Sequence, residues 1–336
     1  MLKLRQFFII LLFTFPFLAS FSSNGIPVNF YASYTTPEGI RIISCSEEWD
    51  KAKLVELYKE FIENKHGDEF SLLNGIVIDG GAHSSSLTKG SYSALTNTIT
   101  LYQGDKYTEP ADYAETLTHE YGHHFAYHYF PSHHLPFSKW SELRGLVVEA
   151  TRWDAFWNYN ESDHALYPQE IFADDYVLLY GVTKEMDMKD VFTNEAFYVR
   201  TEHENQQLSN VLENNELIEF IESESGLKVE HSRLLQVPVL TEYNDENLFF
   251  EITKKANVAY RLNLSFHHEE NEPAKEDWEL YNVTNENTGN VLQFSLAEID
   301  KEVFAKYEYM TISVDTVDLS TSLGFKSEEI KLKLIQ

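Results

Sequence analysis

Three residues in the stretch ETLTHEYGHHFAYH, at positions 115–128, have the types and the spacing of a metal-binding helix. On an α-helix His119 and His123 leave the same face one turn apart, so both imidazoles can bind one Zn²⁺ ion. Glu120 is the next residue around the helix, where a carboxylate can act as base on a metal-activated water. The surrounding segment is rich in histidine, so the motif by itself leaves open a purely structural histidine-rich helix.

A catalytic zinc ion needs three protein ligands and an open position for water. One class of zinc peptidase takes its third histidine from the same segment, with glycine at position 126 and histidine at 129. This chain has Ala126 and Tyr129 at those positions, which excludes that class. The third ligand must therefore come from elsewhere in the chain.

The stretch YPQEIFADDYVLLYG, at positions 167–181, offers that ligand. It predicts a helix that begins near Pro168, because proline suits the first turn. Glu170 and Asp174 are then one turn apart. We predict that Glu170 is the third ligand and that Asp174 accepts the outer N–H of a zinc-bound histidine, as the partners of metal ligands usually do.

Two alternatives for the third ligand remain open. Glu149 is the first, but Trp153 occupies the position one helical turn later, so no carboxylate accompanies it. The second is an aspartate ligand, either Asp174 or Asp175. We favour Glu170 over both.

Gly122 lies between the two histidines, inside the expected helix over residues 108–130. Glycine in a helix interior costs about 1 kcal/mol relative to alanine. The close approach of a neighbouring element would explain this residue.

The motifs THEYGHHF and QEIFADDY together resemble a gluzincin, a zinc peptidase with His-Glu-x-x-His and a downstream glutamate ligand. The interval between His123 and Glu170 is longer than in thermolysin-like members. It is closer to that of the anthrax-lethal-factor-like group, whose ligand lies in a Glu-Phe-Phe-Ala-Glu stretch similar to EIFAD. The resemblance covers about residues 75–181. It implies a zincin fold, one catalytic zinc ion and endopeptidase activity on protein or peptide substrates, which would pair with an edge strand at 92–102.

The resemblance also implies a tyrosine or histidine near the second helix that stabilises the tetrahedral oxyanion. The candidates are Tyr159, His164 and Tyr167, and Asp163 occupies the position of the lethal-factor-like spacing. We select Tyr167, with core packing as the competing explanation for each tyrosine.

The remaining sequence predicts the elements that position this site. Helical periodicity appears over 46–67, a buried strand over 75–83, and further helical stretches near 138–158, 168–180 and 204–225. Beyond about residue 236, seven short β-type runs recur every 10 to 20 residues, which is typical of an immunoglobulin-like or fibronectin-III-like sandwich. We therefore expect an α+β zincin-like metallopeptidase domain at 23–235 and an all-β sandwich domain at 236–336.

The N-terminus has the three regions of a secretory signal peptide. Lys3 and Arg5 precede the apolar stretch FFIILLFTFPFLA at 7–19, and small polar residues follow it. We assign residues 1–22 to the signal and expect a secreted or cell-surface protein. Cys45 is the one cysteine in the sequence, so no internal disulfide can form.

The formal net charge of −28 argues against binding to nucleic acid or to anionic lipid, because both are themselves negative. No later stretch has the length and apolar character of a membrane span. The patterns favour a secreted zinc-dependent endopeptidase with Glu120 as general base. The alternative is a zinc-binding, non-catalytic zincin-like surface or adhesion protein. The sequence leaves the oligomeric state open.

Overall fold

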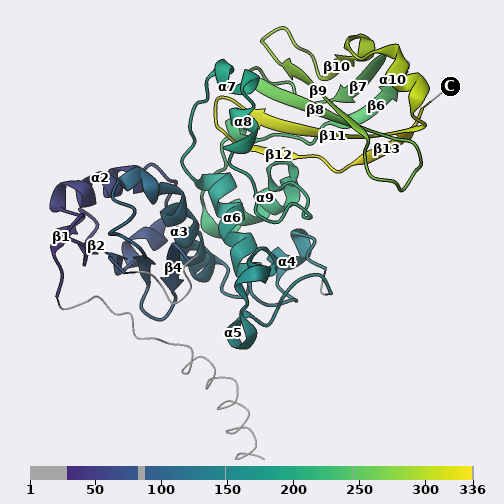
Figure 1. Cartoon of the computed structure of the whole chain (residues 1–336). Coiled ribbons are helices and arrows are strands. Elements are labelled where there is room, and N and C mark those ends of the chain that lie inside the picture. Colours follow the sequence, from purple (N-terminus) through teal and green to yellow (C-terminus); the bar gives the residue numbers. More distant parts are fainter. Residues whose placement is uncertain (1–28, 82–87, 148, 245, 335–336) are drawn as a thin grey trace, which may run out of the picture. The chain divides into compact units, whose positions relative to one another are not determined.

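The computed structural model of the 336-residue chain describes residues 29–81, 88–147, 149–244 and 246–334 (Figure 1). The chain divides into two compact units. The first comprises the described residues up to Val182 together with Glu216–Val229, and the second comprises Thr183–Asn215 together with the described residues from Glu230 onward. No helix within the described ranges is long and apolar enough to cross a membrane. The predicted signal peptide at residues 1–22 lies outside these ranges.

A five-stranded mixed sheet, counted over the described residues, forms one layer of the first unit. Its order is β1-β2-β3-β5-β4, in which β2, β3 and β5 run parallel and the two outer strands pair antiparallel. The residues of β3 and β5 are all buried, as expected for strands covered on both faces. The strands are β1 (Ala32–Thr35), β2 (Arg41–Ser44), β3 (Gly75–Ile78), β4 (Gly90–Ser93) and β5 (Thr98–Leu101).

The single edge strand predicted over 92–102 is wrong. The chain instead forms a hairpin, in which β4 and β5 pair antiparallel and residues 94–97 make the turn. Asn97 has a φ of 49°, a left-handed conformation that asparagine tolerates better than most residues. The outer strand at this end of the described sheet is therefore β4, and β1 is the outer strand at the other end.

The helices of the first unit include the two predicted to carry the site. A short 3-10 turn, η2 (Pro110–Asp112), precedes the first of them, and the backbone N–H of Glu109 donates to the Asp112 carboxylate at 3.1 Å. The second begins at Pro168 as predicted. The helices are α2 (Lys51–Phe61), α3 (Ala114–Tyr129), α4 (Lys139–Leu143), α5 (Ala155–Asn158), α6 (Pro168–Tyr180) and α9 (Asn215–Ser225).

Helices α3 and α6 cross closely at Gly122. A Cβ atom on Gly122 would lie 2.8 Å from the Cα atom of Ala173 and 2.9 Å from its carbonyl oxygen. No side chain fits in that space, which is the reason expected for an interior glycine. The close crossing turns the first part of α6 toward the histidines of α3.

The described residues of the second unit form two antiparallel sheets, ordered β10-β7-β6 and β12-β11-β8-β9, with β13 also paired to β11. Each of the seven predicted β-type runs contains a strand. The three-residue β12 was not predicted, because so short a segment carries almost no alternation. The strands are β6 (Val239–Tyr243), β7 (Asn247–Glu251), β8 (Val258–His267), β9 (Glu276–Val283), β10 (Val291–Ser295), β11 (Tyr309–Asp318), β12 (Gly324–Lys326) and β13 (Ile330–Lys333). The chain is thus mixed α/β followed by β-rich structure, and the immunoglobulin-like topology remains a prediction.

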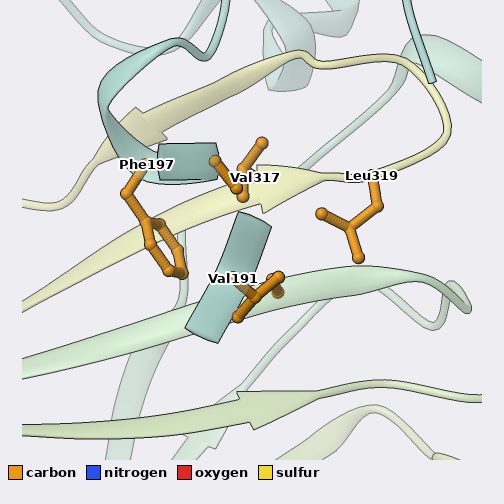
Figure 2. Close-up of a cluster of buried hydrophobic side chains, with 6 residues drawn as sticks. Val191, Phe197, Val317 and Leu319 are labelled. Atoms are coloured by element: carbon orange, nitrogen blue, oxygen red, sulfur yellow. The ribbon is translucent and has the colours of Figure 1, made fainter. Parts of the chain in front are cut away.

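Two short helices, α7 (Met188–Phe192) and α8 (Glu195–Tyr198), belong to this second unit, as does α10 (Lys301–Lys306). Figure 2 shows side chains of the buried cluster that joins the first two to the larger sheet. Its members are Val191, Ala196, Phe197, Ala259, Val317 and Leu319. The compact unit that holds the strands therefore also contains residues 183–215. The domain boundary at 235/236 remains a prediction.

Candidate metal centre

The side chains of His119, His123 and Glu170 meet where α3 crosses α6. One ligand atom from each lies within 4.8 Å of the other two. The Glu170 Oε2 atom is 3.2 Å from His119 Nε2 and 3.1 Å from His123 Nε2. Ligands about 2.0 Å from a tetrahedral zinc ion would be about 3.3 Å apart, which is close to these distances. The group could hold a metal ion.

Glu170 is 8% exposed, so its charge needs partners. Burial alone would raise the pKa of this carboxyl. The charge of His123 and the hydrogen bonds from His119, His123 and His164 outweigh that effect and hold the pKa well below its usual range. Glu170 is therefore an ionised carboxylate, the form that binds metals.

The other ring nitrogen of His119 is also occupied, because Nδ1 lies 2.9 Å from Asp174 Oδ1. A carboxylate can only accept, so Nδ1 carries a proton and donates it to Asp174, while Nε2 faces Glu170. The contact predicted between Asp174 and a histidine of the motif is present. Burial lowers the pKa of His119, but the hydrogen bonds with Asp174 and Glu170 and the charges of Asp174 and Glu120 raise it well above the usual value overall.

Glu120 lies beside this group without belonging to it. Its Oε2 atom is 4.0 Å from His123 Nε2, and the residue is 7% exposed. Burial raises the pKa of the Glu120 carboxyl more than the charges of His123 and His119 lower it. A carboxylate with a raised pKa next to a metal position is suited to accept a proton near neutral pH.

The alternative third ligands lie outside the group. Asp175 is fully buried, and its two carboxylate oxygens accept from Arg144 Nε at 3.0 and 3.1 Å. Glu149 is not among the residues whose ligand atoms converge.

His164 also contacts the group. The sequence raised this residue only as one of three candidates for oxyanion binding. It lies in the 3-10 turn η3 (Glu161–Leu166), just before α6. Its Nε2 atom is 3.2 Å from Glu170 Oε2, and its ring stacks on that of His119 with centroids 5.9 Å apart. It is not one of the three residues whose ligand atoms all lie within 4.8 Å of one another. His164 therefore contacts two of the three residues, Glu170 and His119, without completing a four-ligand set.

Tyr167 is buried, and its hydroxyl group is occupied by the backbone. It donates to the Asn158 carbonyl oxygen at 3.1 Å and accepts from the Asn160 N–H at 2.8 Å. A tyrosine has a single hydroxyl proton, so this arrangement argues against the role in oxyanion binding predicted for Tyr167. The ring of Tyr159 stacks on the Tyr167 ring with centroids 5.0 Å apart, and Tyr159 is half-exposed.

Strand β4 lies against the face of α3 that carries the group. The Tyr92 ring stacks on His123 with centroids 6.5 Å apart, and the Tyr92 hydroxyl is 3.1 Å from His124 Nδ1. The other nitrogen of His124 faces the Glu69 carbonyl oxygen at 2.9 Å. His124 is thus a buried packing residue, and Tyr92 fixes the spacing between strand and helix.

The chain matches no protein-family model and no curated protein sequence.

Proposed function

We propose that this protein is a secreted, zinc-dependent endopeptidase with a zincin-like catalytic unit of the gluzincin type. One observation carries the proposal. Two imidazoles and one carboxylate converge within 4.8 Å of one another, with a further buried carboxylate beside them. Two histidines with one glutamate form a ligand set of catalytic rather than structural zinc sites.

Zinc is the ion that this donor set fits best. Neutral imidazole nitrogens and a carboxylate oxygen suit Zn²⁺, whereas Ca²⁺ and Mg²⁺ prefer oxygen ligands alone. When bound here, the ion would polarise a scissile carbonyl group and lower the pKa of its water toward about 7. His119, His123 and Glu170 would hold it, and Asp174 would keep His119 in the tautomer that binds through Nε2.

Glu120 would act as the general base. Its carboxylate takes the proton of the attacking water and then delivers it to the nitrogen of the leaving amine. The new bond joins the water oxygen to the carbonyl carbon, and the bond that breaks is the peptide C–N bond. The raised pKa of the buried Glu120 favours both transfers near neutral pH.

His164 is the donor that we propose for the developing oxyanion, in place of Tyr167. Its present partner, Glu170, would turn toward a bound ion, and the His164 side chain is only 31% exposed. Its Nε2 atom lies 3.2 Å from Glu170 Oε2, beside the residues that would hold the ion. Tyr159 is the second choice. Burial raises its pKa, and the charges of Glu170, Glu161 and Glu120 raise it further, which supports this second choice.

Substrate would bind as an extended segment along β4. This strand lies at the end of the described sheet order and packs on the helix that carries Glu120. Main-chain pairing with a sheet edge gives affinity without demanding one particular sequence.

The test compares the secreted protein with the variants Glu120→Gln, His164→Ala and Tyr159→Phe. Cleavage of casein and of a mixed peptide library is measured together with zinc content. We expect about one zinc ion per wild-type chain and cleavage that Glu120→Gln abolishes while retaining zinc. If His164 binds the oxyanion, His164→Ala lowers kcat by about 10²–10³-fold and leaves zinc content unchanged.

Other outcomes would change this conclusion. If the wild type and Glu120→Gln both contain zinc and neither cleaves the substrates, a non-catalytic zincin-like surface protein is favoured. Absence of zinc from the wild type would show that the histidine cluster does not retain this metal. A lower kcat for Tyr159→Phe, together with an unchanged kcat for His164→Ala, would assign the oxyanion role to Tyr159.

A further inference from the structure

Gly90 of β4 lies directly against the Glu120 side chain. A Cβ atom on Gly90 would lie 2.8 Å from Glu120 Oε1 and 2.9 Å from Glu120 Cγ. It would also lie 2.6 Å from Thr116 Cγ2, one turn earlier on α3. All three distances are shorter than contacts between real atoms allow, so any side chain at Gly90 must displace one of these groups.

Three features show that this is a close approach of backbone to a functional side chain. Gly90 is buried, and it pairs in register with Leu101 of β5. Two residues further on, Tyr92 faces the same helix and contacts His124 through its hydroxyl group. The strand therefore cannot move away from α3 at Gly90 without disturbing the contacts of Tyr92.

We propose that Gly90 is a positioning residue for the base. The bare backbone of β4 at this point is the surface against which the Glu120 side chain rests, and it holds the carboxylate toward the metal group. The functional part of this inference rests on the proposed peptidase activity. The placement of Glu120 itself does not depend on that activity.

A competing explanation is that the spacing between strand and helix alone requires glycine at this position. The contact with Thr116 allows an experiment to distinguish the positioning of Glu120 from the spacing between strand and helix. The change Gly90→Ala adds a methyl group that meets both Thr116 and Glu120. Adding Thr116→Ser removes the Cγ2 atom and keeps the hydroxyl group, so the collision with Glu120 alone remains.

The experiment measures kcat, KM and zinc content for wild type, Gly90→Ala, Thr116→Ser and the double variant, with crystal structures of the wild type and both Gly90 variants. We expect Thr116→Ser to behave as wild type. We expect Gly90→Ala to lower kcat by about a hundredfold, because small misplacements of a catalytic group cost that much. KM and zinc content should not change, and the Glu120 carboxylate should be displaced in the crystal. The double variant should remain as slow as Gly90→Ala.

Recovery of kcat in the double variant would overturn the proposal, since it would assign the loss to spacing. An undisplaced Glu120 in Gly90→Ala would overturn it as well. If Gly90→Ala does not fold, the double variant carries the same test without the Thr116 collision. If the wild type cleaves nothing, the proposed function fails, and the position of Glu120 in the crystal structures still decides the role of Gly90.

Discussion

His119 Nδ1 donates to Asp174 Oδ1 over 2.9 Å, and this contact joins the metal-binding face of α3 to the second turn of α6. It keeps a proton on Nδ1, so that Nε2 is the nitrogen that can release its proton to a metal ion. It also places the ring so that Nε2 faces Glu170 at 3.2 Å. The pair therefore sets the direction from which His119 can approach a metal ion.

Replacing this partner should weaken the metal site without removing a ligand. We expect Asp174→Asn to bind zinc about 10–100-fold more weakly than wild type, as is typical when such a partner of a ligand is lost. Competition with a chelator measures the affinity. Glu115→Gln, a charge change on the exposed face of the same helix, serves as control. Equal affinities for Asp174→Asn and wild type would contradict the role of Asp174.

The third ligand can be identified by paired substitutions. Glu170→Gln should reduce bound zinc far below one ion per chain, because a neutral amide is a poor substitute for a carboxylate ligand. Glu149→Gln changes the same functional group and should retain the metal. Zinc content after exhaustive dialysis measures both. Loss of zinc from Glu149→Gln with retention in Glu170→Gln would show that the ligand was wrongly assigned.

Metal uptake should depend strongly on pH. The pKa of His119 is raised well above its usual value, so this imidazole is protonated at neutral pH in the metal-free protein. Zinc must displace that proton, and affinity should therefore rise as pH increases through about 6 to 8. Calorimetry in buffers of different ionisation enthalpy measures the proton released. Affinity that is independent of pH across this range would contradict the protonation of His119.

The helix crossing should tolerate no side chain at Gly122. Alanine would gain about 1 kcal/mol of helix propensity. Its methyl group would meet the backbone of Ala173, and such overpacking costs about 1–3 kcal/mol. We expect a net loss in the free energy of unfolding and a weaker affinity for zinc, since α6 carries Glu170. Urea denaturation and zinc titration measure the two effects.

His128→Ala, at an exposed position of α3, is the control for that variant because it raises helix propensity without touching α6. A Gly122→Ala protein more stable than wild type would show that α3 and α6 adjust freely at this crossing. The predicted reason for the glycine would then fail.

Local periodicity alone determined much of the candidate site. His119 and His123 share a helix face because of the 3.6-residue repeat, and Pro168 starts α6 because its missing N–H costs nothing there. The same repeat places Asp174 one turn after Glu170. The β-type runs beyond residue 236 were also readable, because the alternation of side chains is a property of neighbours along the chain.

Tertiary structure decided what no local pattern contains. The hairpin that makes β4 the outer strand, the contact of His164 with Glu170, the backbone partners of the Tyr167 hydroxyl and the position of Gly90 against Glu120 all depend on how separate segments pack. Asp175 was a less favoured alternative to Glu170 in the sequence, and in the folded unit its carboxylate pairs with Arg144. A helical repeat specifies which residues share a face, whereas the neighbour that this face meets is set by the packing of the whole unit.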